Sequence, residues 1–244
     1  MNDKLPVLVT GATGAIGTEI ARGLSSHGER LIIACRSREK GEKLLSLLAG
    51  EGNQLHSLLL LDLADPESVT KAIHELKGMP LKGIVNVAGI MCRDYRTDSR
   101  GEELTIAVNC RATMRLSRAL LPQVADGGVI VFTTSLTRFM GPRKGYSLKV
   151  DRSSFSQLAT YGLSKKALTD AAMQLAAENP RLRIVCFDPG IVDTGMISLH
   201  RWFDPLADIF FRPFIRSPRK GAMPAIRAFY GKETGRIYTL RRGR

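Results

Sequence analysis

With 244 residues, 44% of them hydrophobic, the chain can bury one substantial core, and we expect a single domain over residues 1–244. No apolar run reaches the roughly 18 residues that a membrane-spanning helix needs, and residues 1–4 lead straight into a strand-like segment instead of a signal peptide, so we expect a cytosolic protein. The net charge is +13, and the four cysteines lack the spacing of a metal site, which predicts reduced thiols and no bound metal.

Short apolar runs alternate along the chain with longer stretches of helical period, the pattern of βαβ units. We expect strands at residues 5–10, 30–35, 54–61, 83–88, 129–134, 181–187 and, with the weakest pattern, 236–240. We expect helices at residues 15–27, 38–49, 66–77, 101–123 and 159–178. Most strands are apolar on both faces, as in a sheet that helices cover on each side. The predicted fold is therefore α/β, with a doubly wound, mainly parallel seven-stranded sheet.

A glycine-rich segment lies between the first expected strand and the first expected helix, and it reads Thr10-Gly11-Ala12-Thr13-Gly14-Ala15-Ile16-Gly17. Gly11 suits a tight turn, the small Ala15 lets the backbone approach a pyrophosphate, and Gly17 permits close packing of helix on strand. The free N–H groups of the helix N-terminus point at the anion. The segment predicts a dinucleotide phosphate site, and an ordinary strand-to-helix turn is the alternative.

The end of the second expected strand bears on which dinucleotide fits. An NAD-selective site would carry Asp or Glu there to accept the ribose hydroxyls, whereas this chain has Cys35-Arg36-Ser37-Arg38. Two guanidinium groups offer charge-assisted partners to a 2′-phosphate, which favours NADP(H) over NAD(H). The alternative is that both arginines are solvated and Ser37 only caps the next helix. Asp62 and Leu63 close the third expected strand and are candidates for contact with the adenine edge.

Tyr161 and Lys165 stand four residues apart in an expected helix, so both side chains lie on one face, one turn apart. A tyrosine with a pKa near 10 is ionised to only about one part in a thousand at pH 7, and a nearby cation helps it to exchange protons. Such a pair also occurs by chance in many helices. Its meaning depends on the rest of the chain.

Taken together, these segments resemble the short-chain dehydrogenase/reductase family over nearly the whole chain. The resemblance rests on a set of motifs in the family's order: Thr10-Gly11-x3-Ala15-x-Gly17, Asn86-Val87-Ala88-Gly89, Asn109, Ser135, Tyr161-x3-Lys165 and Asp188-Pro189-Gly190-Ile191-Val192-Asp193-Thr194. Ala15 and Val87 depart from the family's usual glycine and asparagine. The resemblance implies a Rossmann-type domain that transfers hydride between a nicotinamide and a carbonyl or alcohol.

The resemblance also implies the role of each candidate catalytic residue. Tyr161 would exchange a proton with the substrate oxygen while Ser135 holds that oxygen. Lys165 would lower the Tyr161 pKa and bind the nicotinamide ribose. Asn109 would hold a water that links the lysine to solvent, and the alternative is that it is a buried amide that kinks its helix.

The cofactor would lie along the whole set of motifs, with the Ile191 backbone and the Thr194 hydroxyl on the carboxamide and pyrophosphate. The residues expected to bind it are Gly11, Thr13, Ala15, Ile16, Gly17, Arg36, Ser37, Arg38, Asp62, Leu63, Asn86, Ala88, Gly89, Tyr161, Lys165, Pro189, Gly190, Ile191 and Thr194.

The substrate is less defined by the sequence. Ser135 and Tyr161 are 26 residues apart, about twice the family's usual separation, so residues 136–158 are expected to build a substrate wall. This spacing, with Ile33-Ala34-Cys35-Arg36, most resembles the retinol dehydrogenase-like branch, whose members act on apolar alcohols and aldehydes. Residues 195–220 mix aromatic rings with arginines and could form a lid, an interfacial segment or a helix covering the sheet.

The leading hypothesis is an NADP(H)-dependent alcohol dehydrogenase or carbonyl reductase for a bulky apolar substrate, and the alternative is a catalytically idle dinucleotide sensor or partner-binding protein. Residues 201–244 hold eleven Lys or Arg against three Asp or Glu. This basic region could contact an anionic membrane surface or nucleic acid, or serve solubility alone, but no specific nucleic-acid motif accompanies it. Members of the family form both homo-oligomers and monomers, so the assembly stays open.

Overall fold

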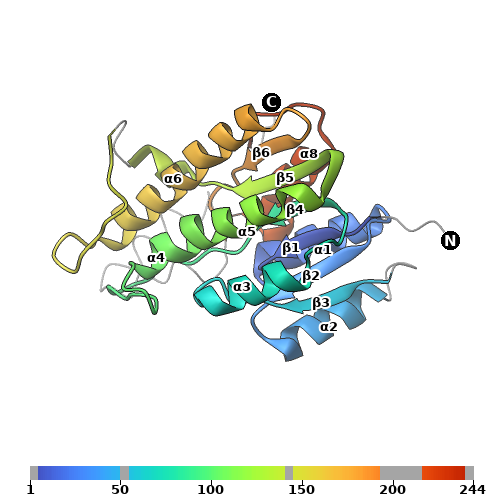
Figure 1. The fold of residues 1–244 in the computed structure, drawn as a ribbon, viewed down its shortest axis with the longest axis horizontal. Coiled ribbons are helices and arrows are strands. Elements are labelled where there is room, and N and C mark those ends of the chain that lie inside the picture. The colour runs from blue at the N-terminus through green and yellow to red at the C-terminus, as the bar shows by residue number, and fades with distance from the viewer. Residues whose placement is uncertain (1–4, 50–54, 141–144, 193–215, 240–244) are drawn as a thin grey trace.

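The computed structural model describes residues 5–49, 55–140, 145–192 and 216–239. Its centre is a seven-stranded parallel sheet in the order β3-β2-β1-β4-β5-β6-β7 (Figure 1). The strands are β1 (Val7–Thr10), β2 (Leu31–Cys35), β3 (Ser57–Leu60), β4 (Leu81–Asn86), β5 (Val124–Thr133), β6 (Arg183–Phe187) and β7 (Ile237–Tyr238). The chain runs outward from β1 to β3 and then returns to β4 on the other side of β1. Because both series start at the centre, a crevice opens beyond the carboxyl ends of β1 and β4.

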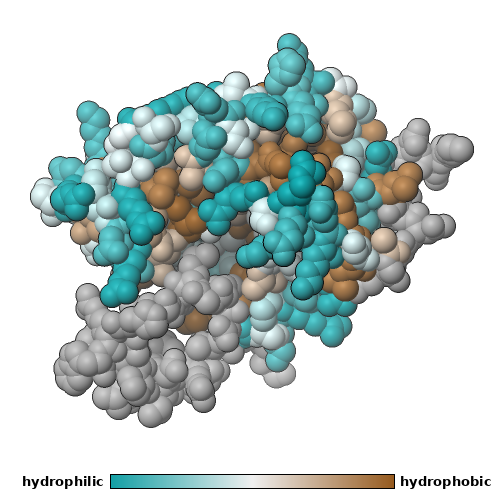
Figure 2. All heavy atoms as spheres, turned by 90° about the horizontal axis from the view of Figure 1, so that it is seen from below, coloured by the Kyte–Doolittle hydropathy of each residue, from teal (hydrophilic) through white to brown (hydrophobic). Residues whose placement is uncertain are grey.

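Helices cover both faces of the sheet, which confirms the predicted fold class. The larger helices are α1 (Ala15–Ser26), α2 (Arg38–Ala49), α3 (Pro66–Glu75), α5 (Thr113–Leu120), α6 (Gln157–Glu178) and α8 (Pro218–Tyr230). Alternate strand residues point to opposite faces, and so they divide between two cores. Leu8 and Ile84 pack with α3, α5 and α6, whereas Val7 and Val9 pack with α1, α2 and α8. On the face drawn in Figure 2, apolar side chains gather between hydrophilic ones.

Several helices begin where the sequence predicted, because capping residues stand at their N-termini. Asp65 caps α3 by accepting the Glu67 N–H at 2.9 Å, and Pro66 takes the first helical position. Ser37 accepts the Lys40 N–H at 3.3 Å and so caps α2. The capping role of Ser37, left as an alternative by the sequence, is therefore real.

Two regions differ from the expected elements. The helix expected at residues 101–123 is divided into α4 (Leu104–Ile106), a π-helical segment η1 (Ala107–Ala112), α5 and a 3₁₀ turn η2 (Leu121–Gln123). Helix α8 was not expected at all, because Gly221 and Pro224 within it weaken its helical pattern. The residues of α8 therefore belong to the folded body, although the sequence assigned them to a basic tail, whereas β7 agrees with the weak strand expected at residues 236–240.

The described residues hold no helix that is long and apolar enough to cross a membrane. They also hold no group of three or more His, Cys, Asp or Glu side chains that could bind a metal ion.

Candidate active site

A cavity of about 690 Å³ lies at the carboxyl ends of the strands. Most of the residues that the sequence predicts for the site line it: Gly11, Thr13, Ala15, Ile16, Gly17, Arg36, Ser37, Asp62, Leu63, Ala88, Gly89, Ser135, Tyr161, Lys165, Pro189, Gly190 and Ile191. Arg38, Asn86 and Asn109 do not line it, and Thr194 lies outside the described residues. Residues far apart in the sequence thus meet at one edge of the sheet.

The glycine-rich turn has the shape that a pyrophosphate site needs. Gly11 has a φ of 62°, and a Cβ at this position would stand 2.7 Å from the Ala88 backbone. A Cβ at Gly17 would stand 2.1 Å from the Gly11 carbonyl oxygen, so only glycine allows α1 to approach this closely. No side chain caps α1 at Gly14, and the N-terminal turn of the helix lines the cavity. Its N–H groups are therefore available to an anion, and the turn fits a dinucleotide.

The two arginines after β2 point in different directions. Arg36 lines the cavity, whereas Arg38 is exposed and pairs with Glu42 at 3.7 Å, one turn along α2. Lys40, which the sequence analysis did not single out, lines the cavity instead. The structure does not bring Arg38 to the cavity, because α2 begins at that position and the side chain lies along the helix toward Glu42, so its contact with a cofactor stays a prediction.

Asp62 and Leu63 close the pocket beside this basic end. The Asp62 carboxylate accepts the Ala64 N–H at 2.9 Å, which fixes the turn after β3. Cys35 also lines the cavity, and burial raises the pKa of its thiol, so the thiol stays protonated at neutral pH.

Asn86 supports the cavity from beneath and does not face it. Its side chain is buried, and its amide donates to Ser117 at 3.0 Å. Its backbone carbonyl accepts the Thr133 hydroxyl at 2.7 Å, which joins β4 to β5. The structure does not bring the Asn86 side chain to the cavity, whereas the neighbouring Ala88 and Gly89 line it, so the contact of Asn86 with a cofactor stays a prediction.

Asn109 is fully buried in the π-helical segment η1, and protein groups occupy its amide. The amide oxygen accepts the Ile90 N–H at 2.8 Å, while the amide nitrogen donates to the Ile90 carbonyl at 2.8 Å and to the Ser164 hydroxyl at 3.0 Å. Ser164 in turn donates to the Tyr161 carbonyl at 2.7 Å. Asn109 thus joins the segment after β4 to the helix that carries Tyr161. Its water-holding role stays a prediction.

Lys165 reaches the cavity from α6 while 2% exposed. Its ammonium donates to the Thr133 carbonyl at 3.0 Å and lies 5.8 Å from the centre of the Tyr161 ring. Burial lowers its pKa to about 8, although the nearby Cys186 and Asp188 oppose this shift. A Cβ on Gly89 would stand 3.3 Å from this ammonium, so Gly89 leaves the space beside it open.

Tyr161 and Ser135 come together as the sequence predicts. Both side chains line the cavity, and the Ser135 oxygen accepts the Thr137 hydroxyl at 3.0 Å and the Thr137 N–H at 3.3 Å. Burial raises the pKa of Tyr161 to about 12; the nearby Ser135 hydroxyl acts to lower this pKa, and Asp188 acts to raise it. The role of Lys165 in lowering this pKa stays a prediction.

The turn after β6 closes the same end of the cavity. Gly190 has a φ of 73°, and Pro189, Gly190, Ile191 and Val192 line the pocket. The Gly190 N–H donates to the Asp188 carboxylate at 2.9 Å. Of the expected lid at 195–220, the structure describes only residues 216–220: Arg216 donates its N–H to the Ile191 carbonyl at 2.9 Å, and α8 begins at Pro218.

Comparison with known proteins agrees with this arrangement. The family model described as short chain dehydrogenase matches residues 6–201. The chain belongs to this family. The short-chain dehydrogenase is 30% identical to polyprenol dehydrogenase of Mus musculus over 91% of this chain and 70% of that protein, and 30% identical to retinol dehydrogenase 11 of Homo sapiens over 90% and 71%. These relatives confirm the likeness to the retinol dehydrogenase-like branch.

A solved relative supports the same fold. A short-chain dehydrogenase of Shigella flexneri in complex with NADP superposes with a TM-score of 0.72, at 25% identity, over 99% of this chain and 98% of that one. The present short-chain dehydrogenase is thus an oxidoreductase that acts on alcohols or carbonyls with a nicotinamide cofactor.

Proposed function

We propose that this short-chain dehydrogenase uses NADP(H) to interconvert the carbonyl and alcohol forms of a bulky apolar substrate. The proposal rests above all on the convergence of Ser135, Tyr161 and Lys165 at one end of a cavity whose other end carries Arg36 and the glycine-rich turn.

The proton-transfer set supplies what the carbonyl reduction needs from the protein. A bound nicotinamide would supply or accept hydride at its C4 atom. Ser135 holds the substrate oxygen, because Thr137 occupies lone pairs of the serine oxygen and leaves its proton free to donate. Tyr161 donates its proton to the same oxygen as the carbonyl becomes an alcohol. A phenol with a pKa of about 12 stays protonated at neutral pH, which suits the donor role.

Lys165 is proposed to bind the nicotinamide ribose and to stabilise the phenolate when the reaction runs toward the carbonyl. Moving the Tyr161 pKa by one unit requires about 1.4 kcal/mol, so a return from 12 toward 7 requires about 7 kcal/mol. The lysine and an oxidised nicotinamide are both cations, and both would act on the phenolate in a partly dry site.

Apolar side chains support the choice of substrate. Those that line the cavity near the proton-transfer set are Ile90, Met91, Leu104, Val108, Leu136, Leu158 and Val192. Leu136 and Leu158 come from the two ends of the segment that separates Ser135 from Tyr161, which supports residues 136–158 as a substrate wall. A hydrophobic lining with few polar groups favours an extended apolar molecule.

NADP(H) preference is proposed from the cations at the far end of the cavity. Arg36 and Lys40 line it together, and both are exposed, so they are free to meet a 2′-phosphate. A relative solved with NADP has the same fold.

The decisive test of the function is Tyr161→Phe, assayed with NADPH and a panel of lipophilic aldehydes and ketones. Loss of the proton donor should lower kcat about 10²- to 10⁴-fold while leaving the dinucleotide bound. Tyr146→Phe is the matched control, since Tyr146 bonds Asp170 at 2.7 Å and does not line the cavity. Turnover that persists in Tyr161→Phe would contradict the mechanism. A parent protein that binds NADPH but reduces nothing in the panel would favour the idle-sensor alternative.

The cofactor assignment is tested by comparing Arg36→Asp with Arg38→Asp. Both changes alter the net charge equally, but only Arg36 lines the cavity. Arg36→Asp should weaken NADPH binding about 10- to 100-fold, which corresponds to a lost charge-assisted contact, and should spare NADH. Arg38→Asp should change NADPH affinity about twofold or less by the loss of local charge. Equal effects of the two substitutions in a fluorescence titration would refute the assignment of Arg36.

A further inference from the structure

A buried ion pair lies behind the proton-transfer set, between the ends of β5 and β6. Arg138 belongs to the 3₁₀ turn η3 (Leu136–Met140) after β5, and Asp188 directly follows β6. Their side chains are 12% and 3% exposed, and a guanidinium nitrogen lies 3.0 Å from a carboxylate oxygen. Neither residue lines the cavity. The pair is therefore placed to act through its neighbours.

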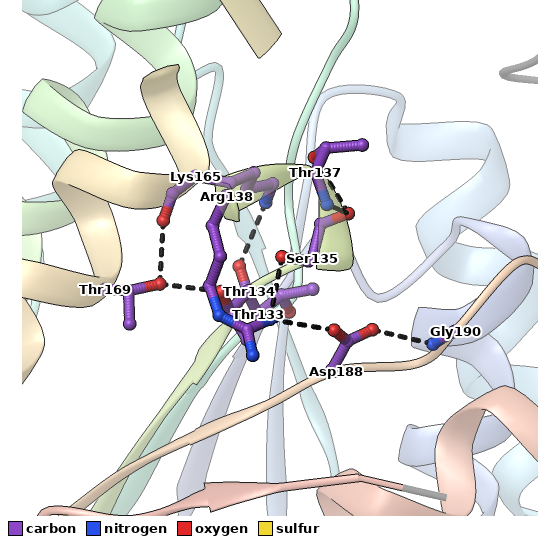
Figure 3. A network of polar contacts seen from close by, with 9 residues as sticks. All are labelled: Thr133, Thr134, Ser135, Thr137, Arg138, Lys165, Thr169, Asp188 and Gly190. Atoms are coloured by element: carbon purple, nitrogen blue, oxygen red, sulfur yellow. Dashed lines mark hydrogen bonds and ion pairs between the residues drawn. The ribbon is translucent and has the colours of Figure 1, made fainter. Parts of the chain in front are cut away.

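Each member of the pair also holds a backbone group of the candidate active site (Figure 3). The nitrogen of Arg138 that meets Asp188 also donates to the Ser135 carbonyl at 2.8 Å, and the second oxygen of Asp188 accepts the Gly190 N–H at 2.9 Å. The connection thus runs from the serine that would hold the substrate oxygen, through the ion pair, to the turn that closes the nicotinamide end of the cavity.

Helix α6 holds the end of β5 and the residue that follows it. Lys165 donates to the Thr133 carbonyl at 3.0 Å, and Thr134 and Thr169 share a hydrogen bond of 2.6 Å. These bonds fix residues 133 and 134 against the helix that carries Tyr161. Arg138 fixes the next carbonyl, that of Ser135, against β6.

A buried ion pair contributes little net stability, because its desolvation offsets its attraction, so stability alone does not account for its presence here. Hydride transfer depends on sub-ångström alignment of the reacting groups, and a misplacement of about 1 Å can cost about 100-fold in rate. We propose that Arg138 and Asp188 are positioning residues that hold the Ser135 hydroxyl in register with the Pro189–Gly190 turn, so that the substrate oxygen and the nicotinamide are presented together. This inference rests on the proposed function.

The two ends of the pair have different kinetic consequences. Arg138→Met releases the Ser135 carbonyl and should lower kcat. Asp188→Ala removes the acceptor for Gly190 and should raise the KM for NADPH. Asp188→Asn keeps an oxygen at that place, so its effect on the KM should be smaller than that of Asp188→Ala.

The double variant Arg138→Met/Asp188→Asn separates positioning from folding. It removes both buried charges, so we expect it to unfold within a few degrees of the parent even if Arg138→Met alone, which leaves a buried carboxylate unpaired, folds poorly. Its kcat should still be about 10- to 100-fold lower than that of the parent, with the KM for NADPH within about threefold. Parent-like kcat in a stable double variant would show that the pair is only structural and would overturn the proposal.

The matched control is Arg181→Met/Asp126→Asn. This second Arg–Asp pair also measures 3.0 Å, and Arg181 also holds the Val124 carbonyl, but it lies at the opposite ends of β5 and β6. It should leave kcat and KM unchanged.

Direct titration of NADPH by fluorescence provides a readout that does not depend on turnover. If the parent reduces no substrate, the proposed function fails, while the ion pair is still judged by binding. Asp188→Ala should then weaken NADPH affinity at least about fivefold more than Asp188→Asn does. Equal affinities of the two variants would overturn the positioning role of Asp188 whether or not the protein is an active reductase.

Discussion

At the scale of single residues, Lys165 shows how burial and function oppose each other. Its ammonium is 2% exposed, and the Thr133 carbonyl is its hydrogen-bond acceptor. Burial disfavours the charged form and brings its pKa from the ordinary value of 10.5 down to about 8. At neutral pH the folded protein therefore keeps the buried Lys165 ammonium charged, which lowers its free energy of unfolding.

This cost predicts a pH dependence of folding. Between pH 8 and 10.5 the unfolded chain binds a proton at Lys165 that the folded chain releases, so the free energy of unfolding rises with pH, by up to about 3 kcal/mol. In Lys165→Met this contribution should be absent, so the parent should gain stability relative to the variant as pH rises from 8 to 10. Urea denaturation at both pH values measures it.

Lys166→Met is the control for this experiment, because Lys166 is the next residue and pairs with Asp170 at 2.9 Å instead of entering the cavity. It should keep the pH dependence of the parent. A stability difference between parent and Lys165→Met that does not change with pH would contradict the depressed pKa.

Residue spacing predicted the proton-transfer set well and the basic end less well. Ser135, Tyr161 and Lys165 meet because parallel strands end at one edge of the sheet. Arg38 was expected beside Arg36, but it is the first residue of α2 and pairs with Glu42 outside the cavity, while Lys40 lines the cavity with Arg36. The start of α2 was expected at residue 38, so the missing information was which side chains of its first turn face the cavity, and this depends on how the helix is set against the sheet.

At the scale of elements, the π-helical segment η1 is the main departure from the expected helix. A π turn is a local change of the backbone hydrogen bonds to the i→i+5 pattern over a few residues, which is too short for apolar periodicity to reveal. Asn109 lies in η1 with its amide turned to Ile90 and Ser164, and the Thr113 hydroxyl donates to the Val108 carbonyl at 3.0 Å within the altered turn. The sequence alternative of a buried amide that distorts its helix is thus the arrangement observed.

Helix α6 meets the 3₁₀ turn η3 at a point where only glycine fits. A Cβ at Gly162 would stand 2.6 Å from the Thr137 carbonyl oxygen. Gly162→Ala should therefore push η3 away from α6, lower stability by about 1–3 kcal/mol and reduce kcat several-fold, because Thr137 orients Ser135. Thermal denaturation and steady-state kinetics measure the two effects.

Gly23→Ala is the matched control for this substitution. Gly23 also lies inside a helix, α1, but a Cβ there would meet the flexible end of Ile226 at 2.4 Å, remote from the cavity. It should leave kcat unchanged. If Gly162→Ala retained parent-like kcat and stability, the tight contact with η3 would have no role in placing Ser135.

At the scale of the whole molecule, the sequence predicted the sheet because its strands are apolar on both faces and alternate with amphipathic helices. It predicted the last strand of the basic C-terminal region but not the helix α8 that covers the sheet before it. Ala222, Ala225 and Phe229 of α8 are buried against the sheet, while Arg219 and Lys220 stay exposed. Counting charges detects the exposed side of such a helix and overlooks the small apolar residues on its other side.

The position of β7 in the sheet bears on folding during synthesis, because β7 is translated after its neighbour β6. The Tyr238 carbonyl accepts the Asp188 N–H at 2.8 Å, and the Arg236 carbonyl accepts the Cys186 N–H at 2.9 Å, so one of the last described strands holds the turn on which the nicotinamide end depends. A chain still emerging from the ribosome presents β6 as an open edge, to which other strands can pair. We therefore expect the turn after β6 to gain its backbone hydrogen bonds only once residues 236–238 have paired with β6.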